Sequence, residues 1–386
     1  MIDRALQANI KKTSKSVLLL GPRQTGKSTL MQQLAPDLTI NLARESEFLN
    51  FTANPDELEQ RIAAIRPKTV FIDEIQRIPE MLNTVQALID DAKQEKKALK
   101  FLLTGSSARK LRRGKANLLP GRILNYTLGP LTQYELGAGF NAKRAMALGT
   151  LPEPYLEPDI STATKLLEAY AGTYLTEEIQ AEALSRNLQG FSRFIKVAAS
   201  VSGQFLDFSK ISQAAKVSRT STIRYFEILE DTLLVYRLTP FTDTVTTADL
   251  IKHNKFYFFD PGVLNGLLNN FSVSLDRVGA LFEHLLVSQL FATATALDKH
   301  VSIHTFRTRG GLEVDFILKI KDKIWAIEAK ATSHPTTHDT NTLLAASKYL
   351  PAKTRYILTI PDGASRRLKN GIEIMALSKL LNELSH

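Results

Sequence analysis

The chain contains no cysteine among its 386 residues and only one tryptophan. The lack of cysteine excludes a disulfide scaffold, a zinc site built on thiolates and a thiol nucleophile, and it fits a reducing cytosol. The N-terminus lacks the charged and apolar segments that direct secretion. No apolar run approaches the length of a membrane span. We therefore expect a cytoplasmic protein without a membrane partner.

Acidic residues are outnumbered by basic ones, 39 against 49, which gives a formal net charge of +10. Such a balance favours a polyanionic partner, and nucleic acid is the first candidate. The hydrophobic fraction of 44% is sufficient for a core, and the length suggests two or three domains. We therefore expect a multidomain protein with DNA as a partner.

Residues 21–29 have the spacing of a phosphate-binding loop, G-x-x-x-x-G-K-S. An apolar run that should form a buried strand precedes the loop, and residues with helical spacing follow it. The glycines let backbone N–H groups converge on phosphates, Lys27 would reach the β- and γ-phosphates of ATP, and Ser28 would bind Mg²⁺. The predicted nucleotide-binding residues are Gly21, Pro22, Arg23, Gln24, Thr25, Gly26, Lys27, Ser28 and Thr29.

Residues 69–74 form an apolar strand that ends in two adjacent carboxylates. Downstream of a phosphate-binding loop, this pattern predicts that Asp73 holds the Mg²⁺ shell and that Glu74 activates the attacking water. A further buried strand, residues 99–103, leads into Thr104 and Ser106, either of which could contact the γ-phosphate. The spacing does not choose between them, and an ordinary Gly-Ser turn is the alternative.

Strands expected at 38–42 and 123–128 and a helix at 55–65 complete a domain over residues 1–136, with a parallel sheet covered on both faces. Arg122 precedes the last strand and could stabilise γ-phosphate charge in cis or in trans, or form a structural salt bridge. The basic segment 109–115 could contact DNA or be merely solvated.

Glycines and prolines between 137 and 158 indicate a domain boundary, and a helical linker is expected over 137–185. Residues 186–245 read as helices at 191–199, 208–217 with Ser209 as N-cap, and 219–231, followed by a strand, which is typical of a winged helix. A winged helix can also serve as a packing module or protein-binding lid. The residues expected to reach DNA are Arg219, Thr220, Ser221, Thr222 and Arg224.

A second acidic site is predicted in the last part of the chain, residues 246–386. Residues 313–318 and 324–330 should form a hairpin in which Glu328 and Lys330 share a face. If Asp315 faces Glu328, the group suits Mg²⁺ or Mn²⁺, and Glu283 could complete it from a helix. The alternative is a hairpin whose charges simply face solvent.

With these blocks in order, the chain resembles a widespread prokaryotic family of predicted ATPases that join an AAA-type domain to a C-terminal DUF4143 region. The resemblance implies a winged helix and a C-terminal domain similar to PD-(D/E)XK nucleases, with Asp315, Glu328 and Lys330 matching the D…E-x-K pattern. One departure is Pro261, where relatives tend to carry threonine. The resemblance lies in residues 21–28, 71–76, 103–107, 120–122, 129–131, 151–153, 174–175, 255–260, 313–316 and 327–330.

The sequence therefore predicts an α/β protein with three parts: a P-loop AAA-type parallel-sheet domain, a helical winged-helix middle and an α/β nuclease-like C-terminal domain. Its expected function is ATP hydrolysis coupled to action on DNA. The alternatives are an ATP-driven DNA- or protein-binding switch with an inert C-terminal scaffold, a toxin–antitoxin or phage-defence effector, and a protein remodeller. Ring assembly is common among AAA-type ATPases, and the sequence reveals no interface for a homo-oligomer.

Overall fold

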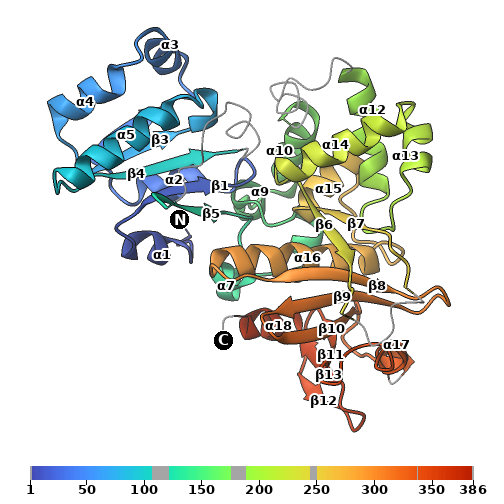
Figure 1. Ribbon diagram of the computed structural model, residues 1–386. Helices are drawn as coiled ribbons and strands as arrows, with labels where there is room; N and C mark the ends of the chain where they lie inside the picture. Colours follow the sequence, from blue (N-terminus) through green and yellow to red (C-terminus); the bar gives the residue numbers. More distant parts are fainter. Residues whose placement is uncertain (1, 107–120, 175–187, 244–249, 337, 385–386) are drawn as a thin grey trace. The chain divides into compact units, whose positions relative to one another are not determined.

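The chain forms two compact units, each with its own sheet. They comprise residues 1–129 with 231–233, and residues 130–230 with 234–386. The computed structural model in Figure 1 describes residues 2–106, 121–174, 188–243, 250–336 and 338–384.

The first unit is built on a five-stranded sheet in the order β2-β3-β4-β1-β5, with all neighbouring strands parallel. Because the carboxyl ends of parallel strands lie at one edge, the segments that follow β1, β4 and β3 are neighbours there, where α/β sheets bind their ligands. The strands expected from the sequence are confirmed. Their bounds are Ser16–Leu20 (β1), Leu38–Asn41 (β2), Thr69–Asp73 (β3), Lys100–Gly105 (β4) and Ile123–Thr127 (β5).

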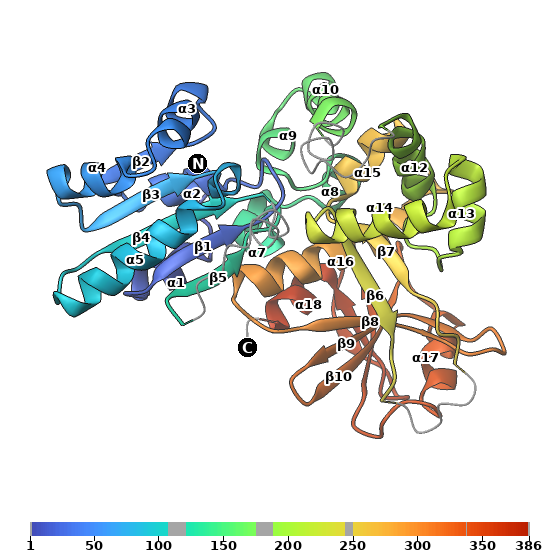
Figure 2. The same cartoon turned by 45° about the horizontal axis from the view of Figure 1, so that its top comes forward.

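Helices cover both faces of this sheet, and they can be followed in Figure 2. Strand β1 shows why: Leu18 belongs to a core that includes α5 side chains, whereas Leu19 belongs to a second core with α1 and α2. Alternation along a strand therefore builds two cores from one apolar run. The helices are Gln7–Lys12 (α1), Lys27–Gln32 (α2), Glu45–Ala53 (α3), Glu57–Ile65 (α4), Ile75–Arg77 (η1) and Met81–Gln94 (α5).

The second unit begins with a helical region that packs around aromatic side chains. The rings of Phe194 and Phe226 meet edge to face with 5.0 Å between centroids. The helices are Gln133–Leu136 (α7), Gly137–Gly139 (η2), Ala142–Leu148 (α8), Pro152–Leu156 (α9), Ile160–Ala169 (α10), Tyr170–Tyr174 (η3), Leu188–Ser200 (α12), Phe208–Ala215 (α13), Arg219–Asp231 (α14) and Pro261–Leu268 (α15).

The N-cap of α13 differs from the expectation. Asp207 caps the helix, because its Oδ1 accepts hydrogen bonds from the backbone N–H groups of Ser209 at 3.0 Å and Lys210 at 3.2 Å. Ser209 lies inside the first turn, since the helix begins at Phe208. The prediction of Ser209 as the cap was therefore wrong, and a carboxylate two residues earlier has that role.

An eight-stranded mixed sheet follows, in the order β12-β13-β11-β10-β9-β8-β6-β7. The β6–β7 hairpin, which would be the wing of a winged helix, lies at the edge of this sheet, because β6 pairs in parallel with β8. The hairpin and the C-terminal strands therefore share one sheet. The strands are Val235–Pro240 (β6), Lys255–Phe258 (β7), Ser302–Arg307 (β8), Glu313–Ile320 (β9), Lys323–Ala329 (β10), Arg355–Ile360 (β11), Arg366–Arg367 (β12) and Glu373–Ala376 (β13).

Helices pack on both faces of this sheet as well. Leu285 of α16 shares a core with Phe316 of β9, whereas Leu343 of α17 shares a different core with Ile317, the next residue of β9. Neighbouring residues of one strand therefore enter separate cores. The helices are Val278–Ala296 (α16), His338–Thr340 (η4), Asn341–Ala346 (α17) and Leu377–Glu383 (α18).

Helix α16 is long and apolar enough to cross a membrane by length and composition alone, and it is the one such helix in the described ranges. This corrects the expectation that no apolar run reaches that length. Inside the unit 67% of the helix's 18-residue apolar stretch is buried. Two of its polar side chains are satisfied there, since His284 Nε2 lies 2.7 Å from the Phe258 carbonyl oxygen and Ser288 donates to the Phe259 carbonyl at 2.7 Å. These contacts are typical of a core helix.

A buried carboxylate joins α8 to α15. Asp260 is fully buried, caps α15 and accepts hydrogen bonds from the N–H groups of Gly262 at 2.8 Å and Thr150 at 2.7 Å. Burial raises the pKa of Asp260 to about 6. Pro261 is the first residue of α15, where no backbone N–H is needed, so the departure from the family pattern is structurally tolerated.

Replacing Gly149 by alanine should lower the free energy of unfolding of this unit by about 3–5 kcal/mol. Gly149 has a φ of +68°, and a Cβ there would lie 1.8 Å from Asp260 Oδ1. Gly137→Ala is the matched control, because Gly137 has a φ of +52° with nothing within 4 Å. It should cost only about 1–2 kcal/mol. Urea unfolding followed by tryptophan fluorescence measures both variants, and equal losses would contradict the steric explanation.

Candidate functional site

At two positions of the phosphate-binding loop, Gly21 and Gly26, the backbone has a conformation or a close contact that favours glycine. A Cβ on Gly21 would lie 2.3 Å from the Leu128 carbonyl oxygen. Gly26 has a φ of +90° and immediately precedes α2. The loop therefore leads directly into the N-terminus of α2, where backbone N–H groups and the helix dipole favour a bound anion.

Lys27 folds back into the loop. Its Nζ donates hydrogen bonds to the carbonyl oxygens of Gly21 and Pro22, both at 2.8 Å, and the residue is only 5% exposed. Thr25 turns inward too and donates to the Pro22 carbonyl at 2.9 Å. The ammonium group thus already lies where phosphate oxygens could replace carbonyl oxygens as its partners.

Arg4 holds the loop in place, and no sequence pattern indicated this role. Its Nη1 donates to the Thr25 carbonyl at 2.6 Å and its Nη2 to the Gly129 carbonyl at 2.9 Å. The side chain is buried. Arg4 therefore ties the loop to the segment that follows β5, and its charge adds to the positive end of α2.

Ser28 and Asp73, the two expected Mg²⁺ ligands, are in contact. The Ser28 hydroxyl donates to Asp73 Oδ1 at 2.8 Å, and Thr104 donates a hydrogen bond to the same oxygen. The contacts follow from the strand order, since β4 lies between β1 and β3. An oxygen pair of this kind fits Mg²⁺, which binds through few protein ligands and keeps several waters.

Glu74 lies beside this pair in a left-handed conformation, with φ 59° and ψ 44°. Its N–H donates to Thr104 Oγ1 at 3.3 Å, and its carboxylate accepts a hydrogen bond from Gln76 Nε2. The same Nε2 donates to Ser106 Oγ at 3.0 Å. Both candidate γ-phosphate contacts, Thr104 and Ser106, are therefore at the site, with Thr104 bound to Asp73 and Ser106 to Gln76.

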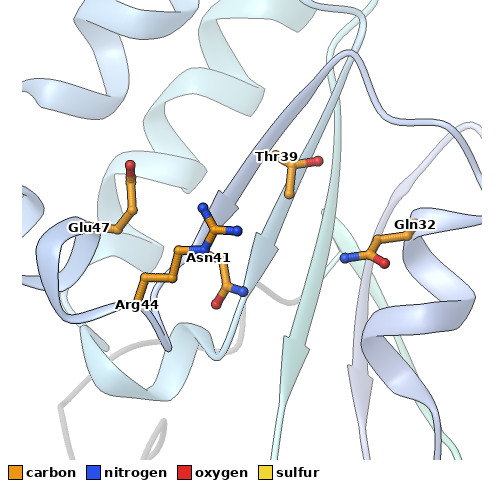
Figure 3. A pocket seen from close by; sticks show the side chains of 5 residues that line it. All are labelled: Gln32, Thr39, Asn41, Arg44 and Glu47. Atoms are coloured by element: carbon orange, nitrogen blue, oxygen red, sulfur yellow. The ribbon is translucent and has the colours of Figure 1, made fainter.

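A polar cavity of about 280 Å³ lies at the end of β2 (Figure 3). It is formed by the end of β2, the end of α2 and the start of α3. Asn41 in its wall pairs with Asp73 across β2 and β3. The cavity is therefore next to the strand that carries Asp73. Its lining residues are Gln32, Thr39, Asn41, Arg44 and Glu47.

Arg122 is not brought to the loop. It lies just before β5, whose first residue pairs with Ser16 at the start of β1, whereas the loop follows the end of β1. Its guanidinium forms a bidentate ion pair with Asp90 of α5, at 2.8 and 2.9 Å. The predicted γ-phosphate contact in cis was therefore wrong, because Arg122 is at the opposite edge of the sheet, and the salt-bridge alternative describes its contacts.

Only some of the α14 residues that were expected to contact DNA are exposed. Arg219, Thr220 and Arg224 are exposed at or near its start. Thr222 is fully buried and donates to the Ser218 carbonyl at 3.1 Å, so it cannot reach a ligand. Ser221 is engaged with Ser218 as well. The basic segment 109–115 lies outside the described residues.

The residues of the predicted acidic site lie near the start of β9 and at the end of β10. Asp315 Oδ2 accepts a hydrogen bond from the Ala329 N–H at 2.8 Å, which aligns it with Glu328. Lys330 Nζ is 2.9 Å from Glu328 Oε1. Glu328 is only 5% exposed, and its Oε2 is buried with no hydrogen-bond partner among the described residues. A buried, unpaired carboxylate oxygen is a feature that a bound cation would satisfy.

Glu283 of α16 interacts electrostatically with Asp315 and Glu328. Burial and then the charge of Asp315 raise the pKa of Glu283 to about 8. The same two causes raise the pKa of Glu328 to about 7, and burial raises that of Asp315. Among the described residues, however, no three His, Asp or Glu side chains are placed to hold a metal ion together. The predicted metal site is therefore not preformed.

Two further residues near these acids, Lys255 and Tyr257, were not predicted as site residues. Lys255 Nζ is 2.6 Å from Glu313 Oε1 and is itself buried. The Tyr257 hydroxyl is buried without a partner among the described residues, and burial together with the charges of Glu283 and Asp315 raises its pKa. Lys255 and Tyr257 lie within the family pattern 255–260, which was the only signal for them.

Three family models match consecutive parts of the chain. An AAA domain covers residues 13–137, a domain of unknown function (DUF8612) covers 140–274, and a second one (DUF4143) covers 278–380. This is an AAA-domain protein with a C-terminal DUF4143 domain. The break between the last two models does not coincide with the division expected near residue 245.

Two curated mycobacterial proteins match the AAA-domain protein over 327 residues. They are the uncharacterized protein Rv2008c of Mycobacterium tuberculosis and the uncharacterized protein Mb2031c of Mycobacterium bovis, each 26% identical. The match covers 83% of this chain and 71% of each relative. The relatedness thus extends beyond the AAA domain.

Two solved structures show a distant likeness to this chain. A replication initiator DnaA bound to AMPPCP and single-stranded DNA is 11% identical, with a TM-score of 0.29 over 58% of this chain and 86% of that chain. The Aeropyrum pernix Orc1 protein in complex with DNA is 12% identical, with a TM-score of 0.27 over 69% and 89%. At these TM-scores the similarity is too weak to support a conclusion about the fold or the function of the AAA-domain protein.

An Arg122→Ala variant of the AAA domain should keep ATP turnover within about twofold and lose less than about 1 kcal/mol of stability, because exposed ion pairs contribute little. The side chains of Arg122 and Asp90 are 36% and 37% exposed. Phosphate release and urea unfolding measure the two quantities. A large loss of turnover with normal stability would instead point to a role of Arg122 in trans.

The DUF4143 domain should lose stability as the pH rises from about 4.5 to about 8. Glu283 and Glu328 have raised pKa values of about 8 and about 7, so the folded protein holds protons that the unfolded chain has released. The stabilisation is complete below the ordinary carboxyl pKa and disappears as the pH passes the raised values. We expect a loss of several kcal/mol, since one pKa unit is worth about 1.4 kcal/mol.

Urea unfolding at pH 5 and pH 8.5 tests this dependence. Trp325 in β10 is 4% exposed and is the only tryptophan of the sequence, so its fluorescence reports this unit. Glu283→Gln should flatten the pH dependence, whereas Glu59→Gln, which changes an exposed acid of the first unit, should not. An unchanged slope in Glu283→Gln would contradict the assignment.

Proposed function

We propose that the AAA domain hydrolyses ATP. The observation that carries the proposal is the chain of contacts from Ser28 to Asp73 to Thr104, directly after the loop that holds Lys27. These groups provide an anion site, two oxygens for Mg²⁺ and an adjacent carboxylate. The combination is the one that phosphoryl transfer to water needs.

The residues would act as follows. Lys27 exchanges the Gly21 and Pro22 carbonyls for phosphate oxygens, and the N-terminus of α2 binds the same phosphates. Ser28 and Asp73 would hold Mg²⁺, which neutralises charge on the phosphates. Glu74 removes a proton from the attacking water. Release of inorganic phosphate from ATP with Mg²⁺, and its loss on chelation with EDTA, tests the proposal.

We further propose that the second unit binds DNA through the start of α14. The exposed Arg219 and Arg224 can reach phosphates, and the net charge of +10 favours a polyanion. Binding should weaken steeply with salt and fall in an Arg219→Ala/Arg224→Ala variant. A matched control is Lys196→Ala on α12, whose side chain is exposed on the same helical region.

The acidic group of Asp315, Glu328 and Lys330 supports metal-dependent cleavage of DNA as the action of this unit. Glu328 Oε2 would bind the cation, Asp315 and Glu283 would share it, and Lys330 would offset charge at the phosphate. The experiment is cleavage of single- and double-stranded DNA with Mg²⁺ or Mn²⁺, with and without ATP. Wild type is compared with Glu328→Ala and Lys330→Ala, both of which should abolish cutting.

A second function is favoured by one specific observation. No three acids of the described residues are preformed as a metal site, which suits an ATP-driven binding switch whose C-terminal domain is an inert scaffold. Salt-sensitive DNA binding without cutting under any of these conditions would support the switch and exclude the nuclease.

A further inference from the structure

Gln76 is buried at the hydrolysis site, and the functions proposed above do not use it. It lies two residues after Glu74, is 5% exposed and spans from η1 to the end of β4. Its Nε2 donates to the Glu74 carboxylate and, at 3.0 Å, to Ser106 Oγ. One amide nitrogen thus connects the expected general base to the end of β4, where the γ-phosphate would lie.

The other end of this amide has no hydrogen-bond partner among the described residues. Gln76 Oε1 is buried, and no donor among the described residues reaches it. The oxygen lies against Gly105, where a Cβ would be 2.9 Å away. Turning the amide over would place an acceptor, not a donor, against the Glu74 carboxylate, so the observed orientation is the favourable one. A buried acceptor without a donor is costly unless a ligand or water satisfies it.

We propose that Gln76 orients the attacking water together with Glu74. Nε2 holds the Glu74 carboxylate in place, and Oε1 accepts one O–H of the water while Glu74 accepts the other. The water oxygen bonds to the γ-phosphorus, the bond to the β–γ bridging oxygen breaks with its electron pair, ADP leaves, and the proton passes to Glu74. This role rests on the proposed ATP hydrolysis.

An amide suits this position for a chemical reason. It donates to a carboxylate and accepts from water at the same time, and it adds no charge beside Glu74. A glutamine orients the attacking water in GTPases as well. The contact with Gly105 adds a steric requirement, because a Cβ there would lie 2.9 Å from Gln76 Oε1 and the amide would have to shift.

The test is a Gln76→Met variant, which keeps the length of the side chain and removes both polar groups. We expect kcat for ATP to fall by about 10- to 100-fold, with KM, the dissociation constant of a fluorescent ATP analogue and the unfolding midpoint close to wild type. Gln60→Met is the matched control, since Gln60 is exposed on α4 of the same unit. Gly105→Ala should lower kcat in the same selective way.

The outcomes separate this role from the proposed function. A Gln76→Met enzyme with wild-type kcat overturns the role of Gln76 alone. A fall in kcat matched by equal losses of ATP affinity or stability also overturns it, because that pattern indicates packing. Absence of turnover in the wild type with Mg²⁺ and ATP overturns the proposed hydrolysis and this role with it.

Discussion

Replacing Glu74 by glutamine is expected to lower ATP turnover by about 10²- to 10⁴-fold, the usual contribution of a general base. Binding of ATP should be retained. The substitution preserves the shape of the side chain and leaves an oxygen to accept the hydrogen bond from Gln76, but the amide cannot take a proton from water. Phosphate release at saturating ATP gives kcat, and titration with a fluorescent ATP analogue gives the affinity.

Glu45→Gln is a suitable control for this variant. Glu45 is also in the first unit, its side chain is 66% exposed, and its ion pair with Arg77 is a surface contact. It should turn over ATP like the wild type. Unchanged turnover in Glu74→Gln would rule out the assigned role of Glu74, since no other carboxylate follows β3 at this position.

A Lys27→Ala variant should lose both ATP binding and turnover, each by about 10²-fold or more, because a charged donor aimed at the phosphates is removed. The ammonium is buried inside the loop, where solvent does not screen it. The Gly21 and Pro22 carbonyls would also lose their donor, so the loop itself should loosen. Affinity and phosphate release are measured as for Glu74.

Lys68→Ala controls for the loss of a positive charge, since Lys68 is exposed between α4 and β3. A second variant, Lys27→Met, keeps the packing of the lysine stem and should be as inactive as alanine. Tight ATP binding by either Lys27 variant would mean that nucleotide binds elsewhere than in the loop.

Much of the first unit could be predicted from the sequence because its signals are local. An apolar run before a glycine loop, and a second run before Asp73 and Glu74, each specify a strand together with the polar segment at its end. The contact between Ser28 and Asp73 is then a consequence of parallel strands, whose ends share an edge. The shared face of Glu328 and Lys330 was predictable for a similar reason, since side chains along a strand alternate with a fixed period.

The features that could not be predicted depend on contacts between distant segments. Nothing in the sequence near Arg122 indicates that this residue forms an ion pair with Asp90. The pair lies at the N-terminal ends of the strands, whereas the loop follows the C-terminal end of β1. Thr222 looked like a ligand contact, but its register on α14 buries it. Gln76 was visible only as a residue of the family pattern, because its role depends on the end of β4, about 30 residues away in the chain.

The pairing of β6 with β8 limits how this protein can be divided. A fragment that begins at residue 246 would leave β7 without β6 and would expose the edge of β8, which is a template for aggregation. Toxicity or inactivity of such a fragment would then be a consequence of misfolding and would not test whether this domain cleaves DNA. The same strand pairing means that the helical region and the C-terminal sheet cannot be separated without breaking the β6–β8 contact.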